Sequence, residues 1–367
     1  MRSRWAFLVI ASIVSPQVAA EQTTRILLVG DSWAARAWRT RAFRTALENK
    51  GIRQFEEKGD VTAIGGTTSS DWATAPYLDR ITDELLAYPT LDIVHLSIGG
   101  NDFLQARPAN LFDALVILLR VLCNTRTVVE HIHSVRPEAR IAYATYDYVP
   151  AGNGFAFELG VLAIAVAFQA QAVPDYFLLN DLGVLHHEFG FPGAFGPGDR
   201  PLPGGYPRYQ PLLGGDPSFP GSPDLFDDPI HPNETGLVAL AEHAIDEFYG
   251  DWLAPTVAID IRPGNEVNLV HPARRELLPV AVLGSVDFDV SDVDANTLVF
   301  GPDGAPALRV VRPLVRDVNR DGLDDLVSFH PVSRTGIGHG DTEACLSFRN
   351  VHGVRFTGCD AIWTRPR

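Results

Sequence analysis

Four short polar stretches in the first two thirds of this 367-residue chain carry side chains that could do chemistry. Gly30-Asp31-Ser32 ends an apolar run, and Asp228-Pro229-Ile230-His231 comes just before a helical pattern. A serine becomes a nucleophile when a histidine takes its proton and a carboxylate orients that histidine. Ser32, His231 and Asp228 supply these three groups. Each motif alone also suits a simpler role, because Ser and Asp are preferred helix N-caps.

The two other stretches contain glycines and could stabilise a developing negative charge. Gly65-Gly66 follows a weak strand candidate that ends near Ala63, and Gly99-Gly100-Asn101 follows the apolar run Ile93–Ile98. Backbone N–H groups at a helix N-terminus and side-chain amides are the donors that stabilise oxyanions. In isolation, a glycine pair or an asparagine after a strand is an ordinary turn. The signal therefore lies in the combination of the four stretches.

The elements that must position these residues follow an alternating pattern from Arg25 to about Gly250. Short apolar runs predict strands, and the longer amphipathic stretches between them predict helices. The predicted strands are Ile26–Val29, the run ending near Ala63, Ile93–Ile98, Ile141–Thr145 and Tyr176–Leu179. The predicted helices are about 33–50, which Gly51 would end, 76–88, 110–134, 154–171 and 234–249. This pattern is typical of a parallel sheet covered by helices on both faces.

The ordered set Gly-Asp-Ser, Gly, Gly-x-Asn-Asp and Asp-x-x-His resembles the SGNH (GDSL) hydrolase superfamily over about residues 25–250. The resemblance implies a flavodoxin-like three-layer α/β/α sandwich with a central parallel sheet. It assigns the nucleophile to Ser32, the general base to His231 and the orienting carboxylate to Asp228. It also implies an acyl-enzyme mechanism that uses no cofactor.

The same resemblance assigns the oxyanion donors. They fall on the backbone N–H of Ser32, the backbone N–H of Gly66 and the side-chain amide of Asn101, with Gly65 as the alternative if the second stretch is shifted by one residue. This chain departs from the commoner pattern at Trp33, where a smaller residue usually follows the serine. That departure removes no catalytic group, but it bears on the shape of the substrate pocket.

The first twenty residues have the form of a secretory signal peptide. Arg2 and Arg4 form a basic start, Trp5–Val14 is apolar but too short to span a bilayer, and small residues precede Glu21. Residues 1–20 hold two basic and no acidic residues, so their removal takes the formal net charge from −15 to −17. Such a charge disfavours nucleic acid and anionic membranes as partners. We therefore expect a secreted or periplasmic protein that is not integral to a membrane, and the sequence leaves its oligomeric state open.

The sequence pattern changes after Trp252 and predicts two domains, a hydrolase domain over residues 21–253 and a mostly-β module over 254–367. Alternating β-type runs and turn residues replace the helical patterns there. Within the first domain, the Pro/Gly-rich stretch 190–223 is predicted to be an ordered, functional insertion.

The C-terminal module contains an acidic stretch with the spacing of a calcium loop. The predicted ligand set is Asp317, Asn319, Asp321, Leu323 and Asp325, with Gly322 at the sharp turn. An EF-hand would need Glu at the twelfth position, where Ser328 stands, so the loop more closely resembles those of dockerin-like and FG-GAP-like modules. A solvated acidic turn is the alternative. Residues 257–359 also resemble a module appended to exported bacterial proteins, for which a binding, anchoring or stabilising role is expected.

Three cysteines occur, and export permits disulfides. Cys345 and Cys359 are close in sequence and are predicted to pair. Cys123 lies inside a helical pattern and is predicted to be a free, buried, small apolar residue.

Arginines crowd the helical pattern that follows Ser32. They are Arg36, Arg39, Arg41 and Arg44. The simplest interpretation is a solvated helix face, and an anion-attracting rim near the site is the alternative.

Three functions are compatible with these residues. The leading hypothesis is an exported serine esterase or lipase-like acyl hydrolase acting on a small ester or lipid. A polysaccharide O-acetyl esterase, with an acylated glycan as substrate, would use the same catalytic residues. A non-catalytic surface-binding protein that relies on the C-terminal module is the third.

Overall fold

The computed structural model describes residues 22–147, 149, 154–189, 225–265, 267–272, 274–309 and 312–364. The predicted signal peptide at 1–20 and the predicted insertion at 190–223 lie outside these residues.

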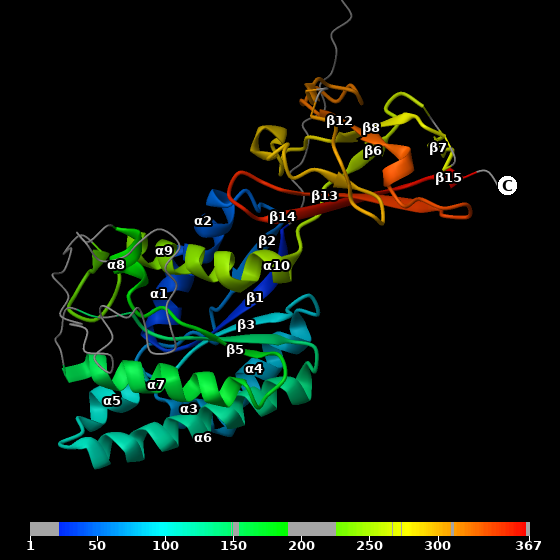
Figure 1. Cartoon of the computed structure of the whole chain (residues 1–367). Coiled ribbons are helices and arrows are strands. Elements are labelled where there is room, and N and C mark those ends of the chain that lie inside the picture. The colour runs from blue at the N-terminus through cyan, green and yellow to red at the C-terminus, as the bar shows by residue number, and fades with distance from the viewer. Residues whose placement is uncertain are drawn as a thin grey trace, which may run out of the picture.

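A five-stranded parallel sheet forms the centre of the N-terminal part (Figure 1). Its order is β2-β1-β3-β4-β5, which is the flavodoxin-like order, so the predicted fold class is confirmed. The strands are β1 Thr23–Gly30, β2 Phe55–Lys58, β3 Ile93–Ser97, β4 Arg140–Ala144 and β5 Tyr176–Leu179. The predicted second strand was misplaced, because Ala63 forms only an isolated bridge with Gly30. The order in which the strands are added reverses at β1, because β2 lies on one side of β1 and β3 lies on the other. Ligands bind at such a switch point, here between β1 and β3, in open α/β sheets.

Helices cover both faces of this sheet (Figure 1). They are α1 Ser32–Thr40, α2 Ala42–Asn49, α3 Ser69–Trp72, α4 Ala75–Ala87, α5 Gly100–Ala106, α6 Leu111–Val135, α7 Gly154–Ala170, α8 Val184–Glu188, α9 Glu234–Ala244, a π-helical turn Ile245–Tyr249 and α10 Gly250–Leu253. The predicted helix 33–50 is two helices, because Arg41 adopts φ 57° between them. Within the described ranges, no helix is both long enough and apolar enough to cross a membrane.

Alternate residues of β1 supply the two layers of core. Ile26 and Leu28 pack in the cluster that contains Phe43 of α2, whereas Leu27 and Val29 pack in the cluster of α4 and α6. Side chains alternate across a strand, so an all-apolar β1 can serve both faces. The sheet is therefore a buried platform that holds its carboxyl ends in fixed positions.

The C-terminal part consists mostly of antiparallel strands. One sheet is β10-β9-β13-β14, another is β11-β12-β8-β6, and β15 pairs in parallel with β7. The strands are β6 Ile259–Ile261, β7 Leu269–Val270, β8 Leu277–Val282, β9 Val299–Phe300, β10 Ala305–Pro306, β11 Leu314–Val315, β12 Leu326–Pro331, β13 Glu343–Arg349, β14 Arg355–Ala361 and β15 Trp363–Thr364. The secondary structure changes from helix to strand between α10 and β6. The division into a hydrolase domain over 21–253 and a module over 254–367 stays a prediction.

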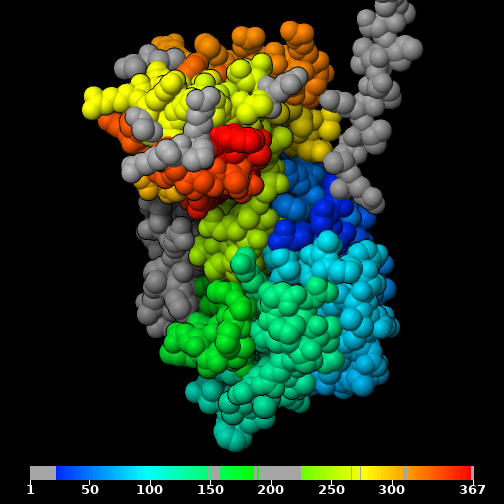
Figure 2. All heavy atoms as spheres, turned by 90° about the vertical axis from the view of Figure 1, so that its right-hand side faces the viewer, coloured from blue at the N-terminus to red at the C-terminus, as the bar shows by residue number. Residues whose placement is uncertain are grey.

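The two parts are in direct contact (Figure 2). Asn350 Nδ2 donates to the carbonyl of Lys50 at 2.7 Å, and the Thr256 N–H donates to Gln54 Oε1 at 3.2 Å. One apolar cluster contains residues from both parts, from Ile26 to Ile362. The module is thus seated on the layer that holds α2 and the turn after α9.

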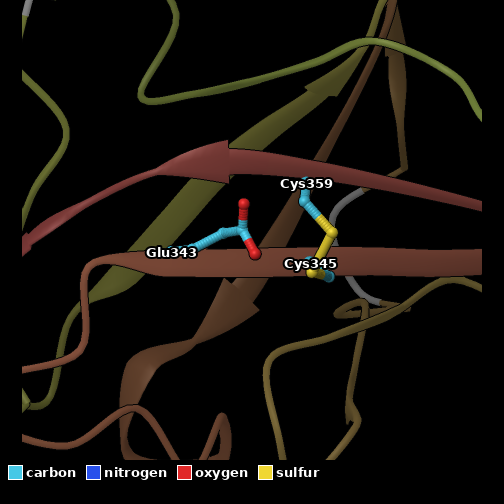
Figure 3. A group of neighbouring side chains, drawn as sticks. All are labelled: Glu343, Cys345 and Cys359. Carbon is cyan, nitrogen blue, oxygen red and sulfur yellow. A yellow bond between two sulfur atoms is a disulfide. The ribbon is translucent and has the colours of Figure 1, made fainter.

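The predicted disulfide between Cys345 and Cys359 is present and links directly opposite residues of β13 and β14. Glu343 lies beside it (Figure 3). These three residues have the proximity of a metal-ligand group, but both sulfurs are used in the S–S bond. The prediction that Cys123 is buried was wrong, since it is free and exposed on α6. The apolar face of α6 is formed instead by residues such as Val121 and Val128.

Candidate active site

Gly30, Asp31 and Ser32 form a tight turn at the carboxyl end of β1. A Cβ on Gly30 would lie 2.0 Å from the carbonyl oxygen of Ser97, so only glycine fits between the two strands. Asp31 caps α1, and its Oδ1 accepts the backbone N–H of Trp33 at 3.1 Å. Ser32 is therefore the first residue of a capped helix at the switch point between β1 and β3.

The structure brings Ser32, His231 and Asp228 together in series. His231 Nε2 lies 2.8 Å from Ser32 Oγ, although the two residues are 199 positions apart. His231 Nδ1 lies 2.8 Å and 2.9 Å from the two carboxylate oxygens of Asp228. The three groups predicted from the sequence thus have the hydrogen-bond geometry that nucleophile activation requires.

Asp228 is held as an anion by its surroundings. Its Oδ1 accepts the backbone N–H groups of Ile230 and His231, each at 2.9 Å. Partial burial on its own would raise the pKa of Asp228, but these bonds and the contact with the His231 ring outweigh it and lower the pKa below the ordinary value. The carboxylate can therefore orient an imidazole at neutral pH.

Asn101 and the Gly65-Gly66 turn lie near Ser32. Asn101 stands in the first turn of α5, and its Nδ2 donates to the carbonyl of Thr67 at 2.9 Å. Gly66 adopts φ +82°, and a Cβ on Gly65 would lie 3.8 Å from the Cβ of Ser32. The second stretch thus borders the serine, and both glycines stay candidates for its oxyanion donor.

Two positioning side chains, Tyr146 and Asp102, were assigned no role from the sequence. Tyr146 donates its hydroxyl to Asp31 Oδ2 at 2.6 Å and accepts the N–H of Gly100 at 3.1 Å. Asp102 accepts the backbone N–H and the hydroxyl of Ser69 at 2.7 Å and 2.8 Å. These bonds tie the serine turn to α5, and α5 to α3. The clue to Tyr146 was its place just after β4, at the same sheet edge, and the clue to Asp102 was its place in the Gly-x-Asn-Asp motif.

Burial in this site strongly changes the pKa of Asp31. Removal from water raises the pKa of Asp31 to about 7, while the bonds from Tyr146 and Trp33 lower it and the nearby Asp102 carboxylate raises it. A buried carboxyl group that is partly protonated near neutral pH thus lies directly before Ser32.

A small cavity adjoins Ser32. The volume that the centre of a water-sized group can occupy in it is about 10 Å³, so it holds about one such group. Its lining residues are Asp31, Ser32, Trp33, Gly100, Asn101, Leu104, Tyr146, Val149 and Ile230. Trp33 and Tyr146 are both buried and meet edge to face, with ring centroids 5.3 Å apart. A larger cavity of about 420 Å³ lies beside β5, α7 and the π-helical turn, but none of the predicted catalytic residues lines it.

The arginine-rich helix face is not uniformly solvated. Arg44 does form an exposed pair with Glu48 at 3.1 Å on the same helix. Arg36 instead bonds Asp227 at 2.6 Å and Asp228 at 3.1 Å. The interpretation of Arg36 as a purely solvated residue was therefore wrong.

The carboxylates of the acidic loop in the C-terminal part accept backbone N–H groups, most of them from the loop itself and one from Gly284. Asp317 accepts the N–H groups of Arg320 and Gly322, and Asp321 accepts the N–H of Leu323. Asp325 is fully buried, and its two oxygens accept N–H groups at 2.7 Å and 2.9 Å. The donor set of hard oxygens fits Ca²⁺ in kind. Calcium binding by Asp317, Asn319, Asp321, Leu323 and Asp325 stays a prediction.

Residues 28–237 match the model of the GDSL-like Lipase/Acylhydrolase family. Together with the flavodoxin-like sheet, this match defines the class of protein, an acyl hydrolase. The chain belongs to the GDSL-like lipase/acylhydrolase family, which confirms the resemblance seen in its motifs.

Several solved structures are similar in part. A family 3 carbohydrate esterase from Clostridium thermocellum is 17% identical, with a TM-score of 0.38 over 62% of this chain and 94% of that chain. The lipase Lip_vut3 from a goat rumen metagenome is 14% identical, with a TM-score of 0.42 over 62% and 98%. The esterase EstA from Pseudoalteromonas is 16% identical, with a TM-score of 0.39 over 63% and 99%. No curated protein matches the chain. Likenesses of this degree carry no information on the substrate.

Proposed function

We propose that this protein is an exported serine esterase. Ser32 takes up the acyl group of the substrate, and water then hydrolyses this acyl-enzyme. The observation that carries the proposal is the continuous hydrogen-bond series from Asp228 through His231 to Ser32. Export rests on the signal-peptide form of residues 1–20. A mature N-terminus at Glu21 in material from the natural host would support export, and an uncleaved N-terminus would oppose it.

In the proposed reaction, Ser32 Oγ attacks the ester carbonyl carbon while its proton passes to His231 Nε2. The resulting oxyanion accepts hydrogen bonds from the backbone N–H of Ser32, the backbone N–H of Gly66 and the amide of Asn101. Collapse of this intermediate breaks the ester C–O bond, and the alcohol leaves with the proton from His231. A water then repeats the sequence on the acyl-enzyme, with His231 again as the base.

The amide of Asn101 suits this role because an NH₂ group has two hydrogens. One donates to the Thr67 carbonyl and fixes the plane of the amide. The other can donate to the oxyanion without reorganisation, which is the source of such stabilisation. Activation of a serine by a histidine base needs no cofactor in the chemistry.

The test is the hydrolysis of p-nitrophenyl acetate by the purified full chain and by its Ser32→Ala variant. We expect turnover by the parent chain and loss of at least ~10⁴-fold in the variant, because no other group replaces the nucleophile. Equal turnover by both proteins would remove Ser32 from the mechanism. The absence of turnover by the parent chain on all esters tested would favour the non-catalytic surface-binding alternative.

The small cavity beside Ser32 favours a short acyl group as the substrate. Its room for the centre of about one water-sized group matches an acetyl methyl better than a long chain. Trp33 and Tyr146 line the cavity, and the bond to Asp31 fixes Tyr146. This observation supports an acetyl group as the acyl part of the substrate, as in the second candidate, an O-acetyl esterase acting on polysaccharide. Release of acetate from acetylated xylan, compared with p-nitrophenyl octanoate hydrolysis, separates it from a lipase-like enzyme.

A substitution at Trp33 tests the cavity itself. Trp33→Leu should raise the ratio of octanoate to acetate kcat/KM by at least ~10-fold, since each accommodated methylene is worth about 1–3 kcal/mol. Leucine keeps part of the apolar volume, whereas alanine would cost about 3–5 kcal/mol of stability. Trp38→Leu on the same helix is the control, because Trp38 does not line the cavity. An unchanged ratio in Trp33→Leu would show that another wall limits the acyl chain.

A further inference from the structure

Arg36 connects the helix of the nucleophile to the loop of the acid and base. It stands four residues after Ser32 in α1, so both project from the same side of that helix. Its Nη1 donates to Asp227 Oδ2 at 2.6 Å, and its Nη2 donates to Asp228 Oδ2 at 3.1 Å. These contacts join residues more than 190 positions apart in the chain.

The loop that carries the acid and base is closed on itself. Phe226 and Pro232 form an antiparallel bridge, and the Asp227 N–H donates to the His231 carbonyl at 3.0 Å. Such a loop keeps its own shape, but its orientation toward Ser32 depends on contacts with the rest of the protein. The guanidinium of Arg36 supplies two of them.

The same carboxylate oxygen serves both partners. Asp228 Oδ2 lies 2.8 Å from His231 Nδ1 and 3.1 Å from Arg36 Nη2. An arginine presents its donors as a rigid planar fork, so it can hold two carboxylates in one geometry, which a lysine ammonium does less well. The plane of the Asp228 carboxylate, and with it the direction of the imidazole, is therefore set partly from α1.

We propose that Arg36 is a positioning residue of this site, which orients the Asp228–His231 unit toward Ser32 without touching the substrate. The inference rests on the proposed function of the three residues. Its effect should appear in kcat rather than in stability, because Asp227 and Asp228 are substantially exposed and exposed ion pairs contribute little to folding. Misplacement of a catalytic group by about 1 Å costs on the order of 10²-fold in rate.

The experiment compares Arg36→Ala, Arg36→Lys and Arg39→Ala in the full chain with p-nitrophenyl acetate as substrate. Arg39 is the matched control, because its Nε donates to the Ala35 carbonyl of its own helix. We expect kcat to fall ~10–100-fold in Arg36→Ala and less in Arg36→Lys, with KM and the melting temperature nearly unchanged. Added guanidinium chloride at non-denaturing concentration should restore part of the loss in Arg36→Ala, whereas the same concentration of sodium chloride should not.

A second variant tests the geometry from the other side. Asp227→Asn removes one charge that Arg36 bonds and leaves Asp228 in place, so we expect a smaller fall in kcat. In the Arg36→Ala background the same change should have no further effect, since the contact is already lost.

Three results would overturn the inference. They are an unchanged kcat in Arg36→Ala, a rise in KM alone, and an equal loss in Arg39→Ala. The proposed function fails separately, through activity that survives Ser32→Ala. The Arg36 variants are therefore assayed only with a substrate whose hydrolysis is abolished by Ser32→Ala.

Discussion

Two polar loops of this protein differ in where their side chains bond. In the 228–231 loop of the N-terminal part, His231 and Asp228 bond to side chains of α1, about 190 to 200 positions away in the chain. In the 317–325 loop of the C-terminal part, Asp317 and Asp321 bond to N–H groups two to five residues away. Asp325 accepts backbone N–H groups too, one from Val318 in the loop and one from Gly284 outside it. Both loops contain aspartate, and both carry a recognisable motif.

The difference separates two uses of the same residue type. Local carboxylate-to-backbone bonds shape a turn and satisfy the turn's own donors. Bonds between side chains of distant elements cost more chain entropy to arrange, so their presence at a sheet edge indicates a site rather than a turn. The comparison supports the proposed catalytic role of the first loop and the proposed structural role of the second.

The largest effect is expected from a substitution of His231, the central residue of the hydrogen-bond series Asp228–His231–Ser32. His231→Ala should lower kcat by ~10⁴–10⁶-fold, because Ser32 then has no base. Asp228→Ala should lower it somewhat less, since the base is present but poorly oriented. Steady-state kinetics on p-nitrophenyl acetate measures both, with circular dichroism as the control for folding. Activity in His231→Ala within tenfold of the parent would contradict the series.

Asn101 tests the oxyanion side of the same site. Asn101→Ala should lower kcat by ~10²–10³-fold with little change in KM, because the amide acts on charge that develops only in the transition state. Measurement of kcat and KM separately decides the role. A rise in KM with kcat unchanged would make Asn101 a substrate-binding residue instead.

The acidic loop should respond to metal and not to substrate. If it binds Ca²⁺ only when folded, calcium at one hundred times Kd adds about 2.7 kcal/mol to the free energy of unfolding. Chelation should then lower the melting temperature of the full chain, and Asp317→Ala should abolish that response. Ester hydrolysis well below the melting temperature should not change. A melting temperature insensitive to calcium and chelator would make the loop a solvated acidic turn.

The smallest effect concerns Asp31, the buried carboxyl group beside the nucleophile. Its pKa is raised from 3.8 to about 7, chiefly by burial, so the folded state binds its proton more tightly than the unfolded chain. The stability that this proton supplies is complete below about pH 4 and is lost as the pH rises to about 7. Asp31→Asn should therefore raise the melting temperature by about 2–4 °C at pH 8 and hardly at pH 4. A pH-independent difference between the two proteins would contradict the raised pKa.

Local signals account for what the sequence predicted well. The apolar runs of β1, β3 and β4 are buried on both faces, and the run of β5 is partly buried, so all four are recognisable as strands. β2 has the sequence Phe-Glu-Glu-Lys and lies at the sheet edge, where no apolar run is needed, and it was therefore misplaced. The motifs around Ser32, Asn101 and His231 are likewise local in sequence.

Contacts that depend on tertiary structure were missed for the same reason. The bond from Arg36 to Asp228 spans 192 positions, and the bond from Tyr146 to Asp31 spans 115. No spacing along the chain encodes either of them. Cys123 was misjudged because the exposed and buried faces of α6 depend on how that helix is rotated against the sheet.

The most direct test of the central claim is covalent labelling of the full chain by a fluorophosphonate, followed by mass spectrometry of its peptides. A serine activated by a histidine should react at phosphorus, with Ser32 as the modified residue and one label per chain. Ser32→Ala and His231→Ala should take up no label under the same conditions. Labelling at another residue, or equal labelling of the Ser32→Ala variant, would contradict the assignment of the nucleophile.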